Sequence, residues 1–200
     1  MPKKSLKGKY LRFSEETNAL YYLERAGVFI QETTSDPKAW KWVILALHGA
    51  LYGFAICACK GSSNATVIRK NKKGHEKLIT LDEALKMCQD KTWMGTLHGG
   101  LSLNLSASQA DSIRRLKATL RNNFEHFTPK GWSIEMHGFP QIAMDILDVI
   151  RFLSIETFRY QHLNQSQRNK IKSVVYQSKR SLKNSDLHLE LLEAKDDKKA

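Results

Sequence analysis

The sequence predicts an all-α protein, an antiparallel bundle of about five helices that carries a small inserted β-hairpin and one short helix. Three observations predict this fold. Long segments repeat apolar residues at helical spacing, several of them open with capping residues, and one short stretch combines β-branched residues with a turn sequence. Residues 1–185 are expected to form one domain with an insertion at about 61–100, and residues 186–200 a frayed, charged tail.

The first two predicted helices differ in how much of their surface is apolar. Ser14 can cap the first helix, which covers residues 14–31 and has an apolar face. Asp36 and Pro37 predict the start of the second helix, whose residues are apolar on nearly all sides. This helix is therefore expected to be the most buried, and its apolar run, Val43–Cys59, is short for a bilayer span.

The insertion contains the predicted hairpin. Residues 66–80 have β-branched or apolar side chains on both sides of Asn71-Lys72-Lys73-Gly74, which indicates two strands joined by a basic turn. A capping box at residues 80–83 then opens a short helix that ends near residue 90.

Three more helices complete the predicted bundle. A capping box at residues 106–109 opens the third large helix, which is expected to end near Phe127 because Thr128 precedes a proline. Apolar spacing predicts a fourth helix over about residues 140–162 and a fifth over about 166–183.

The formal net charge of +12 is concentrated in three segments, residues 3–12, 69–77 and 168–183. Concentrated positive charge favours a polyanionic partner, and RNA or DNA comes before an acidic membrane because no membrane-anchoring amphipathic pattern accompanies it. A solvated, solubilising surface is the alternative for any one segment. Nucleic-acid contacts are expected from seven basic residues: Arg69, Lys72, Lys73, Arg114, Lys117, Lys179 and Arg180.

The cysteines and the N-terminal sequence predict a cytoplasmic protein. Cys57, Cys59 and Cys88 form neither a disulfide framework nor a zinc-binding pair of motifs, so they are interpreted as small buried hydrophobes in a reducing compartment. The basic N-terminus is not followed by a signal-peptide apolar stretch. No carboxylate cluster has metal-binding spacing, and neither a metal nor a cofactor is expected.

The third large helix carries a polar set opposite its apolar stripe. At about 100° per residue, five apolar residues share one face: Ile113, Leu116, Leu120, Phe124 and Phe127. Arg121, Asn122 and His126 fall on the other side and are expected to face outward. Because Arg121 and His126 lie about 7.5 Å apart along the axis, they could reach either side of one phosphodiester.

A guanidinium and an imidazole at this spacing suit phosphate chemistry. The helix dipole favours a protonated imidazole in the last turn, as general acid–base catalysis requires. Arg121 can stabilise the charge that grows on a phosphate in the transition state, and Asn122 can orient either partner by hydrogen bonding. The alternative is an exposed, solvated helix face.

Residues 121–127, RNNFEHF, resemble the Arg-polar-x-x-x-His signature of the HEPN superfamily (higher eukaryotes and prokaryotes nucleotide-binding). In that family the motif lies on the third main helix of a bundle, after an apolar second helix like residues 40–59. The resemblance covers about residues 14–183. The segment WSIEMHGFPQIAMDILDVIRFL, residues 132–153, is also similar to plasmid- or phage-defence members of the family.

The resemblance implies a homodimer in which two motifs meet in one positively charged cleft and cleave RNA without a metal. His126 would act on the ribose 2′-hydroxyl as base or on the leaving 5′-oxygen as acid, Arg121 would stabilise the phosphorane, and Asn122 would support both. The partner protomer would supply the second histidine. The expected products are a 2′,3′-cyclic phosphate and a 5′-hydroxyl.

The resemblance also bears on protein partners. Some toxin members carry a tyrosine two residues beyond the histidine, where a paired antitoxin modifies it. This chain has Thr128 there, which argues against that particular branch. An antitoxin or other regulatory protein remains an expected partner.

Three functions compete. An endoribonuclease that acts as a toxin or defence effector is favoured. The alternative is a non-catalytic HEPN-like module that binds nucleic acid or a nucleotide, and a purely structural dimerisation bundle would leave the basic segments unexplained. Among the other histidines, His48 is interpreted as a hydrogen-bonded core residue, while His137 and His162 flank the fourth helix and could line the cleft.

Overall fold

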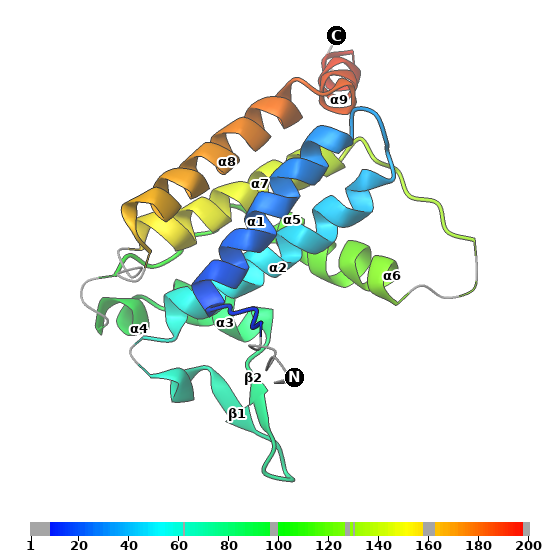
Figure 1. The fold of residues 1–200 in the computed structure, drawn as a ribbon. Coiled ribbons are helices and arrows are strands. Elements are labelled where there is room, and N and C mark those ends of the chain that lie inside the picture. Colours follow the sequence, from blue (N-terminus) through cyan, green and yellow to red (C-terminus); the bar gives the residue numbers. More distant parts are fainter. Residues whose placement is uncertain are drawn as a thin grey trace, which may run out of the picture.

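Four long helices form a bundle in the computed structural model, which describes residues 9–61, 63–96, 100–126, 129, 131–157 and 163–197. They are α1 (Glu15–Glu32), α2 (Ala39–Cys59), α7 (Phe139–Arg151) and α8 (Gln165–Lys183), and they lie side by side (Figure 1). Helix α2 packs on α1 and α7, and α8 packs on the same two helices. The chain is therefore mostly helical, as the sequence predicts.

Helix α2 supplies much of the core. Its large apolar residues are almost entirely buried: Trp40, Val43, Ile44, Leu47, Leu51 and Phe54. The helix begins four residues before the apolar run that the sequence analysis considered short, so among the described residues it is long and apolar enough to cross a bilayer. However, 67% of its most apolar stretch is buried inside the bundle, and that burial accounts for its composition without a membrane.

Local capping determines where several helices begin. The three predicted N-terminal caps are confirmed, with reciprocal side-chain hydrogen bonds at Ser14, Thr80 and Ser106. Asn164 caps α8 in the same way with Gln167, which the sequence analysis did not identify. In contrast, α2 begins at Ala39, because residues 37 and 38 form a turn in which Asp36 accepts a hydrogen bond from the Lys38 N–H at 2.9 Å.

The predicted hairpin is confirmed. After the short 3-10 helix η1 (Asn64–Thr66), strands β1 (Ile68–Lys70) and β2 (Glu76–Leu78) pair antiparallel, with Ile68 opposite Leu78. Gly74 takes a positive φ of 78° in the turn, a conformation that glycine adopts without strain. Helices α3 (Leu81–Gln89) and α4 (Lys91–Thr96) follow, and the Tyr52 hydroxyl donates a hydrogen bond to the Ile79 carbonyl, which ties the insertion to α2.

The third large helix is not uniformly α-helical. It consists of α5 (Ala107–Arg114), the π-helical segment η2 (Arg115–Arg121) and α6 (Asn122–Glu125). Helix α7 likewise continues into a π-helical segment, η3 (Phe152–Glu156). The predicted ends of these two helices, residues 127–128 and 158–162, lie outside the described residues, as do His162 and Thr128.

The C-terminal segment differs from the frayed tail that the sequence analysis expects. Residues Asp186–Asp196 form helix α9, which contacts α7 and α8. Leu187 packs against the hydrophobic core, and this anchoring explains why the segment is ordered.

Candidate functional site

The motif side chains converge on one carboxylate. The Arg121 guanidinium forms an ion pair with Oε2 of Glu125, and Nε2 of His126 lies 3.8 Å from the same oxygen. Asn122 accepts a hydrogen bond from Nη1 of Arg121 at 3.0 Å, so its side chain helps to fix the guanidinium. The structure thus brings Arg121, Asn122 and His126 together, with Glu125 between the two cationic groups.

Arg121 and His126 differ in exposure. The side chain of His126 is 73% exposed, whereas that of Arg121 is 30% exposed and its Nε is buried. The expectation that all three motif residues face outward therefore holds for Asn122 and His126, but only in part for Arg121. A π-helical turn pairs residue i with i+5, so each residue advances through a smaller angle than in an α-helix. This rotation turns Arg121 toward α2 instead of away from the core.

His126 stands at the end of the helix. Its φ of −111° and ψ of 59° are not helical, while its N–H still donates to the Asn122 carbonyl at 2.8 Å. The imidazole is therefore held at a helix terminus, where it is accessible to a large ligand.

A buried carboxylate positions the helix that carries the motif. Asp145 on α7 accepts hydrogen bonds from Ser108 at 2.7 Å and Ser112 at 2.6 Å, both on α5. Gln141 donates a third at 2.8 Å. Because Asp145 is only 7% exposed, these bonds fix the register of α5 against α7 and hence the position of η2 and α6.

Two cavities lie beside Arg121, with volumes of about 400 and 360 Å³. Four residues line both: Tyr22 on α1, His48 and Gly49 on α2, and Arg121. His48 is only partly buried, and within the described part of the chain its imidazole has no hydrogen-bond partner, so the interpretation as a hydrogen-bonded core histidine is wrong. Sequence reasoning missed this residue because α2 meets η2 only through the fold.

The electrostatic surroundings keep His48 neutral. Burial is the main cause that lowers the pKa of this imidazole, and the positive charges of Arg121 and Lys117 act in the same direction. The carboxylate of Glu125 opposes them. At pH 7 the side chain therefore offers one hydrogen-bond donor and one acceptor to the cavities.

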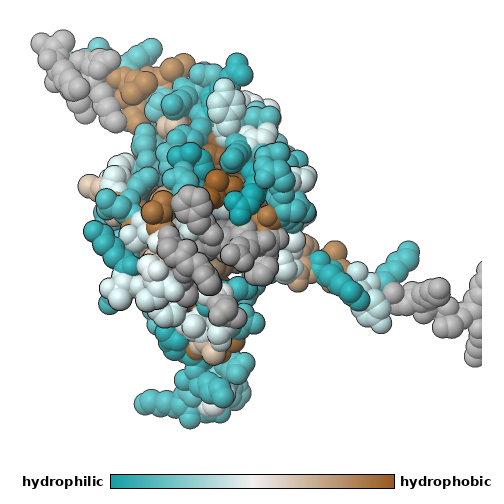
Figure 2. Space-filling view, turned by 90° about the vertical axis from the view of Figure 1, so that its left-hand side faces the viewer, coloured by the Kyte–Doolittle hydropathy of each residue, from teal (hydrophilic) through white to brown (hydrophobic). Residues whose placement is uncertain are grey.

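The predicted nucleic-acid-binding residues lie in three separate places. Arg69, Lys72 and Lys73 are on the hairpin, which projects from the bottom of the bundle as a hydrophilic extension (Figures 1 and 2). Arg114 is exposed and forms an ion pair with Asp111, and Lys117 forms one with Asp82 on α3. The hairpin and α8 lie on opposite sides of the bundle, so these residues do not form one continuous surface (Figure 1).

Lys179 and Arg180 line a groove of about 690 Å³ between α8 and the α7–η3 helix. Three further basic residues line it, namely Arg151, Lys172 and Lys183. Two of the five cations have acidic partners: Lys179 lies 2.5 Å from Asp148, and Arg151 lies 3.0 Å from Glu156. The groove is therefore positively charged overall, but it is not continuous with the Arg121 motif.

One group of potential metal ligands occurs among the described residues. Glu15, Glu16 and Cys57 place ligand atoms within 4.8 Å of one another. The ammonium of Lys60 already lies 2.6 Å from Glu15 and 3.5 Å from Glu16. Since a cation of the protein satisfies both carboxylates, the group does not define a metal site.

No known protein family, curated protein or solved structure matches the chain significantly. The function must therefore be inferred from the site's own geometry.

Proposed function

We propose that the protein is a metal-independent endoribonuclease of HEPN type that acts in the cytoplasm as a toxin or defence effector. The observation that carries the proposal is the convergence of Arg121 and His126 on one carboxylate oxygen of Glu125. A guanidinium and an imidazole that can both approach one anionic oxygen can also approach a phosphodiester in its place.

The chemistry follows from these two groups. The ribose 2′-hydroxyl attacks the adjacent phosphorus, and the bond from phosphorus to the 5′-oxygen breaks. One base takes the proton of the 2′-hydroxyl, and one acid protonates the leaving 5′-oxygen. Arg121 stabilises the negative charge on the phosphorane, and His126 performs one of the two proton transfers. A homodimer would supply the second His126 and complete the site.

The decisive experiment is cleavage of a labelled single-stranded RNA in EDTA. Wild type is expected to yield 2′,3′-cyclic phosphate ends and to leave a 2′-deoxy substrate intact. We expect His126→Ala to lower kcat by about 10²–10⁴-fold and Arg121→Ala by about 10²–10³-fold. His75→Ala, which removes an exposed imidazole from the hairpin, is the matched control and should leave kcat unchanged. Equal cleavage by all variants would rule out this site.

A cell assay tests the proposed biological role. Expression of wild type should arrest growth, and either His126→Ala or Arg121→Ala should relieve the arrest. Arrest by these variants as strong as by wild type would contradict a toxin that acts through RNA cleavage.

The basic groove on α8 favours a second candidate function, a non-catalytic module that binds nucleic acid. Lys172, Arg180 and Lys183 lie on one side of it, away from Arg121. Each phosphate contact that is lost should reduce the slope of log K against log salt by about 0.7 for single-stranded RNA. If variants of these residues abolish RNA binding while Arg121→Ala and His126→Ala change nothing, the second function is correct.

A further inference from the structure

Aromatic side chains surround the cavity next to Arg121. The 400 Å³ cavity is lined from α1 and α2 by Tyr21, Tyr22, Phe29 and Trp42. Tyr21, Tyr22 and Trp42 are 51%, 41% and 50% exposed, which is high for residues that usually bury their rings. Exposed aromatic faces at a cavity provide surfaces on which a flat ligand can stack.

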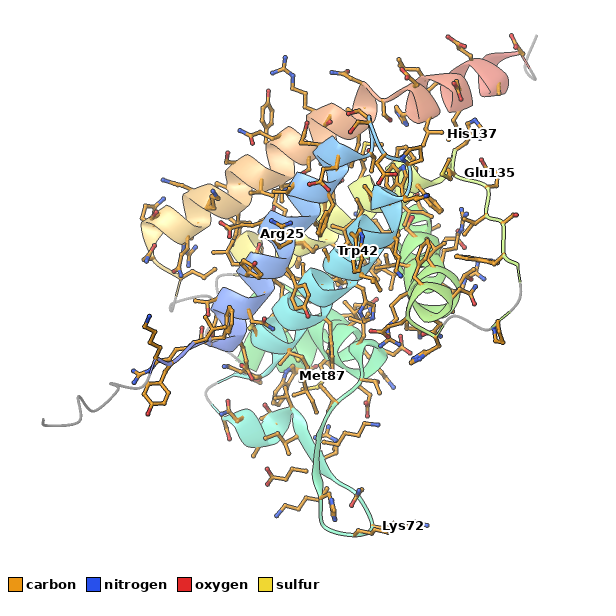
Figure 3. The ribbon with its side chains drawn as sticks, turned by 45° about the vertical axis from the view of Figure 1, so that its right-hand side comes forward. Arg25, Trp42, Lys72, Met87, Glu135 and His137 are labelled. Carbon is orange, nitrogen blue, oxygen red and sulfur yellow. The ribbon has the colours of Figure 1, made fainter. Side chains whose placement is uncertain are left out.

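Positive charge accompanies these rings. Arg25 and Trp42 lie on the same face of the molecule, on the neighbouring helices α1 and α2 (Figure 3). The guanidinium of Arg25 lies 4.7 Å from the centre of the Phe29 ring, and the ammonium of Lys41 lies 5.1 Å from a Trp42 ring. Together with Arg121, they make the rim of the cavity suited to an anionic ligand that also carries an aromatic ring.

The floor of the cavity offers unused hydrogen-bonding groups. The imidazole of His48 is neutral and has no partner within the described part of the chain. Nε of Arg121 is buried and likewise has no partner there, a cost that an anionic ligand drawn onto the guanidinium could remove. Gly49 permits the close approach, because a Cβ at this position would lie 2.7 Å from the Tyr22 ring.

We propose that this aromatic cavity binds the base of an RNA nucleotide whose phosphate is held by Arg121. Trp42 and Tyr22 stack on the base, and His48 hydrogen-bonds its edge. The volume suits a ligand of nucleotide size, since small-molecule pockets measure about 300–1,000 Å³. The assignment rests on the proposed function, because it places the base of the substrate next to the Arg121 motif.

The test measures binding of adenosine 3′-monophosphate and uridine 3′-monophosphate to the full chain by calorimetry. We expect wild type to bind at least one of them, and Trp42→Ala to bind it about 5- to 150-fold more weakly. Tyr22→Leu, which keeps an apolar side chain without the aromatic face, should also weaken binding. His48→Gln should change the preference between the two bases, because glutamine presents its donor and acceptor differently.

Trp132→Ala is the matched control for Trp42→Ala. Trp132 packs edge-on against Phe124, with ring centroids 5.0 Å apart, and does not line the cavity. Its removal should leave nucleotide affinity unchanged. Equal affinity of Trp42→Ala and wild type, or no binding by wild type, would overturn the base-binding assignment.

Two further measurements separate this assignment from its alternatives. If nucleotides bind in a Trp42-dependent manner while RNA is not cleaved, the nuclease proposal fails and the base pocket stands. If RNA is cleaved while Trp42→Ala leaves KM and nucleotide affinity unchanged, only the base pocket fails. Light scattering adds the third outcome: if nucleotides do not bind and Trp42→Ala dissociates a dimer, the aromatic face is an interface between copies.

Discussion

Nε2 of His137 lies 2.9 Å from a carboxylate oxygen of Glu190, which joins the segment before α7 to α9. The other ring nitrogen, Nδ1, contacts Glu135, whose carboxylate also accepts the backbone N–H of His137 at 2.6 Å. Figure 3 shows Glu135 and His137 beside each other near α9. A protonated imidazole can donate to both carboxylates at once, so this contact depends on pH.

Docking of α9 should weaken at high pH. The hydrogen bonds from Glu135 and Glu190 raise the pKa of His137 above its model-peptide value of about 6.5. The stabilisation is therefore complete below about pH 6.5 and is lost as the pH rises through the raised pKa. Hydrogen-exchange protection factors of residues 186–196 should fall between pH 6 and pH 8. His137→Gln should remove this change, and an unchanged pH response in that variant would contradict the contact.

Glu125 occupies the position that a substrate phosphate would need. Glu125→Gln removes a negative charge beside Arg121, and a unit charge about 4 Å away in a water-exposed site is worth roughly 1 kcal/mol. In a His126→Ala background, where RNA is not turned over, we expect Kd for single-stranded RNA to fall about three- to tenfold. Fluorescence anisotropy measures this change.

The control for Glu125→Gln is Asp111→Asn. Asp111 forms an exposed ion pair with Arg114 on the same long helix, so the substitution also removes one negative charge. It lies outside the motif and should change Kd less than Glu125→Gln does. Equal effects would show that overall charge, and not competition for Arg121, controls RNA binding.

Asp145→Ala should destabilise the fold more than any surface carboxylate. The substitution removes three hydrogen bonds and leaves the hydroxyl of Ser112, 4% exposed, without its partner. We expect a loss of about 2–4 kcal/mol in the free energy of unfolding. Asp148→Ala removes an acidic partner of Lys179 on the same helix and should cost under about 1 kcal/mol. Urea denaturation of both variants would show comparable losses if the Asp145 network were unimportant.

The fold was predictable where local chemistry decides it. Reciprocal caps at Ser14, Thr80 and Ser106 and the turn at Gly74 are written in a few adjacent residues, and the structure has each of them. Helix α9 was missed because its order depends on distant contacts, such as that of Glu190 with His137.

The candidate site was predictable only in part, for the same reason. An α-helical wheel places Arg121 opposite the core, but η2 is π-helical and turns the guanidinium toward α2. Apolar spacing is compatible with either kind of turn, so tertiary packing decides between them. The position of His48 beside Arg121 could not be found from spacing at all, since the two residues meet only across helices.

The crossing of α1 and α2 provides the last prediction, because it sets the width of the cavities. A Cβ at Gly53 would lie 2.7 Å from the Cβ of Ala19, closer than real side chains approach. Gly53→Ala should therefore lower the free energy of unfolding by about 1–3 kcal/mol through overpacking. Gly95→Ala on α4 is the matched control: a Cβ there meets nothing within 4 Å, and the change should be neutral or stabilising by up to about 1 kcal/mol. Gly49→Ala should fall between the two, because the Tyr22 ring can turn away where the backbone of Ala19 cannot. Thermal and urea unfolding of the three variants check this order, and equal stability of Gly53→Ala and Gly95→Ala would mean that the helices are not in close contact.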